Sequence, residues 1–173
     1  MALVTTPGST ASDSYATLAA ADAYHLARGN VAWTGTDELK EGALRRGTTW
    51  LDAVYRSRWP GWRLNARDQS LDWPRSGVTD AEGTSVDNDT IPIEIINATI
   101  EAALRELVTP GSLTPDYLAA GQLKSLEVVG VVKREFFADP GQGGSLPVLN
   151  IVDGILASLI GTRSRNVIQL IRA

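Results

Sequence analysis

Residues 91–107 carry the clearest helical period in this 173-residue chain. Apolar side chains recur there every three or four residues, and charged or amide side chains occupy the opposite side of the same helix. Similar patterns predict a helix over residues 17–28, a second over residues 37–55 and a last one over residues 147–160. A short chain with several such helices buries their apolar faces against one another. The expected fold class is therefore mainly α, a small helical bundle.

The helices also predict which side chains face solvent. In the first helix, Asp22, His25 and Arg28 are spaced three apart and form a polar stripe, so we expect Leu26 to pack inside. His25 is the only histidine of the chain and is interpreted as an ordinary helix-surface or packing residue. The second helix holds two pairs of opposite charge at i,i+4 spacing, Glu41–Arg45 and Asp52–Arg56.

A long loop, residues 57–91, separates the second helix from the third and fits no helix or strand period. Connections of this length in a compact domain are usually functional or disordered. Its three tryptophans argue against disorder, because large aromatic side chains are usually buried against a surface. Within the loop, "RLNARDQSLDWPRSGVTDAEG" (residues 63–83) is predicted to be a contact arm pinned by Trp73. Pro74 favours extended backbone at Trp73 and removes a backbone donor.

The two ends of the chain differ from the middle. Residues 1–14 are small and polar and predict a flexible or partner-ordered N-terminal arm, without the features of a signal peptide. Residues 15–161 form the expected helical domain, in which residues 126–137 are β-branched and aromatic and read as an extended or strand segment. Residues 162–173 predict an extended C-terminal tail. No apolar run reaches the ~18 residues that a membrane span requires.

Nothing in the sequence points to catalysis, a metal or a cofactor. Cysteine is absent, so thiolate ligands, disulfides and a cysteine nucleophile are excluded. The acidic segment of residues 80–89 lacks the order of an EF-hand loop, and "DPGQGG" lacks the lysine of a phosphate loop. Asp153 is interpreted as a solvent-facing or helix-pairing carboxylate. We therefore expect a protein that is not an enzyme and binds no cofactor.

Single-stranded nucleic acid is the alternative that the long loop leaves open. Tryptophans there alternate with arginines, and such residues can stack on bases and follow phosphates. In the other interpretation, the tryptophans pin the loop to the helices and the arginines pair with the acidic residues downstream. The net charge is −4, and residues 76–127 carry nine acidic and two basic side chains, which weakens attraction for phosphate. Composition leans toward protein partners.

Seven stretches together resemble a family of tailed-phage and prophage proteins, whose members are often labelled DnaT-like single-stranded-DNA-binding proteins. They are "SYATLAAADAYHLARGNVAW", "LDAVYRSR", "LDWPRSGV", "IPIEIINATIEAAL", "VVGVVKREF", "VDGILASLIG" and "VIQLIRA". The architecture is also similar to that of phage head-tail connector (adaptor) proteins. That resemblance implies a dodecameric ring of copies beneath the portal protein, in the virion neck, after synthesis in the host cytoplasm. It also implies a next neck or tail protein as partner, and genome DNA that passes through the channel without specific binding.

The resemblance implies two contact regions. The portal would be bound by the C-terminal tail, through Arg163, Arg165, Val167, Ile168, Leu170, Ile171 and Arg172. A neighbouring subunit or neck protein would be bound by the long loop, through Trp59, Trp62, Arg63, Arg67, Trp73, Pro74 and Arg75. The tail has a second interpretation, an edge strand within its own domain against residues 126–137. The alternatives to a connector are a single-stranded-DNA-binding replication accessory and a tail-completion protein.

Overall fold

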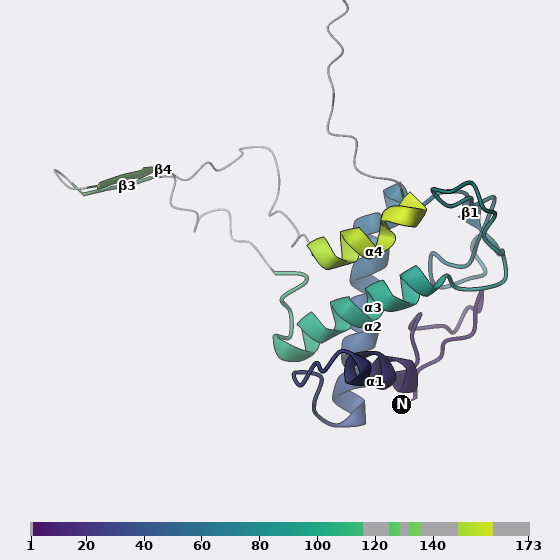
Figure 1. Cartoon of the computed structure of the whole chain (residues 1–173), viewed down its shortest axis with the longest axis horizontal. Coiled ribbons are helices and arrows are strands. Elements are labelled where there is room, and N and C mark those ends of the chain that lie inside the picture. The colour runs from purple at the N-terminus through teal and green to yellow at the C-terminus, as the bar shows by residue number, and fades with distance from the viewer. Residues whose placement is uncertain (1, 116–124, 129–131, 136–148, 161–173) are drawn as a thin grey trace, which may run out of the picture.

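The structure is a computed structural model and describes residues 2–115, 125–128, 132–135 and 149–160. Four helices dominate this part of the chain, as Figure 1 shows: α1 (Leu18–Ala27), α2 (Asp37–Tyr55), α3 (Ile93–Val108) and α4 (Asn150–Ile160). The predicted class, a small and mainly helical fold, is confirmed. The helix bounds lie within a few residues of those predicted from periodicity.

Local signals in the sequence set the helix ends. The Thr17 hydroxyl accepts a hydrogen bond from the Ala20 amide at 3.1 Å and so caps α1. Gly29 follows α1 with φ of +64°, in the left-handed region where glycine is favoured. Asp37 and Glu38 lie in the first turn of α2, where the helix dipole stabilises negative charge. Pro92 immediately precedes α3. Its missing backbone N–H costs no hydrogen bond there, because the first N–H groups of a helix have no partner within the helix.

The predicted orientation of α1 is wrong for His25, placed in the polar stripe, and for Leu26, expected to pack inside. His25 is buried, whereas Leu26 is 84% exposed. The His25 ring lies 5.3 Å from the Tyr24 ring and 4.6 Å from the Trp33 ring, and these contacts hold it inside. Because α1 is short and rich in alanine, the spacing of its polar residues does not determine which side is buried. The aromatic contacts of His25 determine it instead.

The closest helix pair is α2 and α3. Gly47 of α2 faces the α3 backbone, where an added Cβ would lie 2.9 Å from the Ala103 nitrogen and 3.1 Å from the Thr99 oxygen. Two apolar clusters flank this contact, one around Trp50 and Leu51 with α4 and the long loop, and the other around Leu44 and Ile100 with α1. The absence of a side chain at Gly47 therefore lets α2 and α3 approach closely enough for both clusters to pack.

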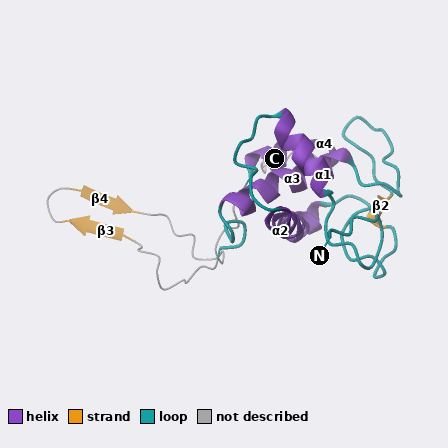
Figure 2. Cartoon of the chain, turned by 90° about the horizontal axis from the view of Figure 1, so that it is seen from below, coloured by secondary structure: helices purple, strands orange, loops and turns teal. Residues whose placement is uncertain are grey.

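The remaining described elements are short. α4 packs on α3 through Val152, Leu156 and Leu159, which are buried. Strands β3 (Ser125–Val128) and β4 (Val132–Glu135) form an antiparallel pair that stands apart from the helices in Figures 1 and 2. The segment predicted as extended thus contains two paired strands. The predicted C-terminal tail and the "DPGQGG" turn lie outside the described residues.

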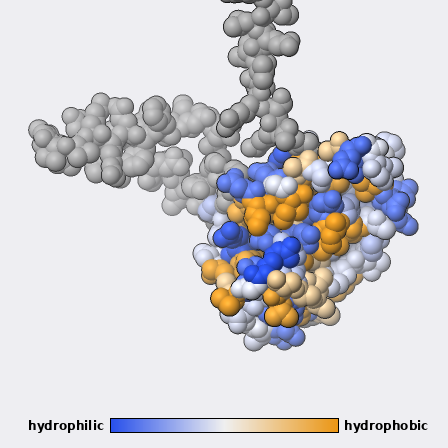
Figure 3. All heavy atoms as spheres, in the orientation of Figure 1, coloured by the Kyte–Doolittle hydropathy of each residue, from blue (hydrophilic) through white to orange (hydrophobic). Residues whose placement is uncertain are grey.

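The surface of the helical part is mixed in character. Figure 3 shows apolar patches separated by hydrophilic residues over the visible face. None of the helices described here has both the length and the apolar character needed to cross a membrane. Several large apolar side chains are nevertheless exposed, among them Leu26, Val31, Ile93 and Val108.

Candidate functional site

The long loop is folded back on itself and lies against the end of α2. A short 3-10 turn, Arg56–Arg58, follows α2 directly. Strand β1 (Trp62–Arg63) then pairs antiparallel with β2 (Arg75–Ser76). The loop region that holds them lies at one side of the helices, where Figure 1 labels β1 and Figure 2 labels β2. A second turn is closed by the Val86 amide, which donates to the Val78 carbonyl at 3.0 Å. The loop is therefore an ordered part of the domain.

A row of aromatic rings anchors the loop to α2. Ring centroids are 6.0 Å apart for Trp50 and Tyr55, 5.5 Å for Tyr55 and Trp59, and 5.8 Å for Trp59 and Trp73. All four side chains are buried. Aromatic side chains of this kind bury roughly 150–250 Å² each. An indole face inside this row is covered by protein and is not accessible to a nucleic-acid base.

Trp62 differs from the other tryptophans, because 66% of it is exposed. Its ring lies over Gly77, where an added Cβ would approach the indole to 2.7 Å. Gly77 also has φ of +69°, so glycine suits this position for two reasons. Trp62 is thus held on the surface by the β1–β2 pair.

Most arginines of the loop are bonded within the chain. Arg75 donates to the carbonyls of Pro60 at 2.6 Å, Gly61 at 2.7 Å and Asp72 at 3.3 Å. Arg63 donates to the Gln69 carbonyl at 3.4 Å. Pro74 is buried next to Trp73, to which it is joined by a cis peptide bond.

The other arginines near the loop pair with carboxylates or face solvent. Arg56 pairs with Asp72 at 3.0 Å, not with Asp52 as its i,i+4 spacing predicted. Arg58 pairs with Asp153 at 3.2 Å. Arg67 is exposed, and no described residue pairs with it. The predicted Glu41–Arg45 pair is present at 3.7 Å.

A buried polar network joins the loop to α2 and to the N-terminal segment. The Tyr15 hydroxyl donates to Asp52 Oδ1 at 2.6 Å and accepts from the Trp73 amide at 3.0 Å. Asp52 Oδ2 accepts from the Asp72 amide at 3.1 Å. Burial, together with the nearby Asp72, raises the pKa of Asp52 to about 6. Burial, together with the hydrogen-bonded Asp52, raises the pKa of Tyr15 well above its usual value. Sequence reasoning missed this network, because Tyr15 and Asp52 meet only in the folded chain.

The N-terminal segment also lies along this loop. The Asn65 side chain donates to the Gly8 carbonyl at 2.9 Å, and the Ser70 amide donates to the Ser9 carbonyl at 3.1 Å. Arg45 of α2 donates to Asp13 at 2.7 Å. Residues 2–14, expected as a flexible or partner-ordered arm, therefore make specific contacts with the loop and with α2.

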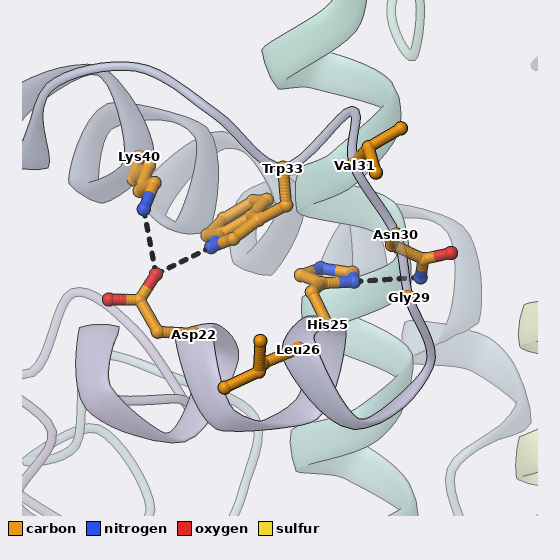
Figure 4. Close-up of a pocket in the computed structure, with 8 residues that line it drawn as sticks. All are labelled: Asp22, His25, Leu26, Gly29, Asn30, Val31, Trp33 and Lys40. Carbon is orange, nitrogen blue, oxygen red and sulfur yellow. Dashed lines mark hydrogen bonds and ion pairs between the residues drawn. The ribbon is translucent and has the colours of Figure 1, made fainter.

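An open hollow of about 370 Å³ lies between α1 and the connection that follows it (Figure 4). Asp22 Oδ1 accepts from Trp33 Nε1 at 2.7 Å and from Lys40 Nζ at 2.8 Å. Burial opposes ionisation of Asp22, but these hydrogen bonds and the Lys40 charge hold its pKa below the usual value. Burial lowers the pKa of His25, whose Nδ1 lies 3.0 Å from the Asn30 amide nitrogen. The rim is apolar, with Leu26 and Val31 exposed.

Two carboxylates noted in the sequence, Asp80 and Asp153, have partners in the structure. Asp80 Oδ1 accepts from the amides of Glu82 at 2.9 Å and Thr84 at 2.8 Å, which stabilises its own turn. Asp153 accepts from the Tyr55 hydroxyl at 2.9 Å as well as from Arg58, so it pairs helices. Within the described ranges, no group of side chains could hold a metal ion. The residues predicted to contact the portal, from Arg163 to Arg172, lie outside the described residues.

A family model described as "Putative DnaT-like ssDNA binding protein" matches residues 1–173. No curated protein and no solved structure has significant similarity to the chain. Because the match spans the whole sequence, the chain belongs to this DnaT-like family.

Proposed function

We propose that this chain is a structural, non-catalytic subunit of the head-tail connector of a tailed phage, which forms a ring beneath the portal. The observation that carries the proposal is that most aromatic and arginine side chains of the long loop are packed or hydrogen-bonded within the chain itself. Trp59 and Trp73 are packed in the core, and Arg75 donates to three backbone carbonyls. These are side chains of the kinds that stack on bases and bind phosphates, and here they stabilise the fold itself.

The charge of the chain supports the same proposal. A subunit whose ring surrounds the genome must let DNA slide, and the net charge of −4 does not favour tight binding of phosphate. Arg56 and Arg58 are neutralised by Asp72 and Asp153, which further reduces the attraction of this face for a phosphate backbone.

The proposed portal contact is the C-terminal tail. Its four large aliphatic residues, Val167, Ile168, Leu170 and Ile171, fall within five positions and can fill pockets beside an added strand. Arg163 and Arg165 would add charge-assisted hydrogen bonds to an acidic rim. The next neck or tail protein would meet the opposite side of the ring.

Truncation of the tail tests this proposal. Deletion of residues 166–173 should leave the melting temperature nearly unchanged and abolish cosedimentation of the protein with purified portal-bearing heads. The full-length chain is the control. If the truncated chain melts far lower, the tail belongs to the helical core, and this attachment is wrong. If the full-length chain does not cosediment with the heads at all, the connector proposal fails.

Single-stranded DNA binding is the second candidate, favoured by the printed description of the family. Trp62 and Arg67 are exposed on the long loop and offer one ring and one charge. Binders of this class usually stack successive bases on several aromatic side chains, and the other four tryptophans here are buried. Gene order separates the two candidates. A connector gene should lie near portal and capsid genes, whereas a replication accessory should lie beside a helicase or primase gene.

A further inference from the structure

One exposed apolar surface surrounds the connection between α1 and α2. Two hollows lie on either side of this connection, with volumes of about 370 Å³ and 400 Å³, and Val31 lines the first while Ala32 lines the second. Val31 is 91% exposed, and Val108, at the end of α3, is 59% exposed and lines the second hollow. We call Leu26, Val31 and Val108, with the nearby Arg28 and Arg105, the α1–α3 surface.

Its charge is positive. Arg28 is exposed and lies over the Tyr24 ring, 3.4 Å from the centroid. Arg105 is exposed beside Val108, and no described residue forms an ion pair with it. Lys40 does not contribute free charge, because it is paired with Asp22 at 2.8 Å.

A second exposed apolar surface lies at the other end of α3. Ile93, the first residue of this helix, is 60% exposed. Asp87 and Asp89 precede it closely in the chain, are exposed and form no ion pair with any described residue. We call these three residues the Ile93 surface. It combines a large aliphatic side chain with negative charge.

The two surfaces cannot meet within one copy. They lie at opposite ends of a helix of 16 residues, which is about 24 Å long at 1.5 Å per residue. Figure 1 shows the start of α3 on the side of the long loop and its end beside the α1–α2 connection. A contact between the two different surfaces places the arginines of one copy near the aspartates of another, whereas a contact of either surface with itself brings like charges together. An antiparallel twofold dimer would form this contact twice and end at two copies, whereas a head-to-tail contact leaves one surface of each kind free for the next copy.

We propose that the α1–α3 surface of one copy binds the Ile93 surface of a second copy. Ile93 enters the apolar rim formed by Leu26, Val31 and Val108, and the opposite charges orient the pair. A contact between two different surfaces repeats from copy to copy and closes into a ring if the rotation allows. This inference rests on the proposed connector function only for the location of the ring beneath the portal. The contact itself is a property of the isolated chain.

Disulfide trapping tests the contact, because the chain has no cysteine of its own. One copy carries Val31→Cys and the other carries Ile93→Cys, and the two are mixed at high concentration under mild oxidation. Disulfides form only when the two Cα atoms approach within about 7 Å. The matched control is Ile151→Cys, a substitution of an exposed aliphatic at the start of α4. We expect the Val31–Ile93 heterodimer to exceed either control pairing about tenfold, because the contact raises the effective concentration.

A chain that carries both substitutions should give a ladder of higher oligomers, as a head-to-tail contact requires. Equal trapping of the control pairings, or a preferred Val31–Val31 homodimer, would overturn the inference. Adding Leu26→Asp to the Val31→Cys copy should reduce trapping to the control value, and unchanged trapping would also overturn it. Cosedimentation of the unmodified chain with portal-bearing heads is a separate readout, so failure of this contact and failure of the connector function are distinguishable.

Discussion

Replacement of Gly47 by alanine tests the closest packing contact in the domain. Helix propensity alone would favour alanine in α2 by about 1 kcal/mol. At this position, however, the new Cβ would lie 2.9 Å and 3.2 Å from the Ala103 nitrogen and Cα, and 3.1 Å from the Thr99 oxygen. All three atoms belong to the α3 backbone and cannot rotate away. Overpacking of this kind costs roughly 1–3 kcal/mol, so we expect the whole helix pair to shift.

Because the backbone has to move, we expect the upper part of that range and a net loss of about 1–2 kcal/mol in the free energy of unfolding. Gly42→Ala is the matched control in the same helix, since its Cβ would meet only the end of the Arg46 side chain at 3.4 Å. This control should gain up to about 1 kcal/mol. Urea unfolding, followed by tryptophan fluorescence, measures both variants. If Gly47→Ala is as stable as Gly42→Ala, then α2 and α3 do not pack this closely.

Two further predictions concern the long loop and its polar network. Trp73→Ala should lower the free energy of unfolding by about 3–5 kcal/mol, whereas Trp62→Ala should change it by about 0.5 kcal/mol or less; equal losses in urea unfolding would refute the anchoring role of the buried row. Burial raises the pKa of Asp52 from 3.8 to about 6, so the folded state holds this proton more tightly than the unfolded state. Stability should therefore fall as pH rises from about 4 to 6, by roughly 2–3 kcal/mol. Asp52→Asn should flatten this part of a melting-temperature profile, and an unchanged slope would contradict the assignment.

Much of the helical framework could be predicted from the sequence, because its signals are local. Thr17 and Gly29 mark the ends of α1, and Pro92 marks the start of α3. The orientation of α1 could not be predicted, because Trp33, which lies beyond the helix, decides that His25 is buried. Here the aromatic contact outweighs helical periodicity.

The candidate site was predicted only in part. The aromatic residues of the loop indicated burial, and Trp59 and Trp73 are indeed buried. The Tyr15–Asp52 hydrogen bond joins residues 37 positions apart, and no spacing rule connects such residues. Arg56 illustrates the same limit, because its partner is Asp72 across the loop and not the neighbour one helical turn away.

The central claim is that this DnaT-like chain acts through protein contacts and not as a single-strand binder. Titration of a dye-labelled oligo-dT at physiological salt, followed by its fluorescence anisotropy, tests it most directly, because this signal does not depend on Trp62, the exposed tryptophan on which a base could stack. We expect only weak association, near the non-specific range of about 10⁻⁴ M, that disappears as salt is raised. Trp62→Ala should leave this association unchanged. Tight, saturable binding at physiological salt that Trp62→Ala abolishes would contradict the account and establish the chain as a single-stranded-DNA-binding protein.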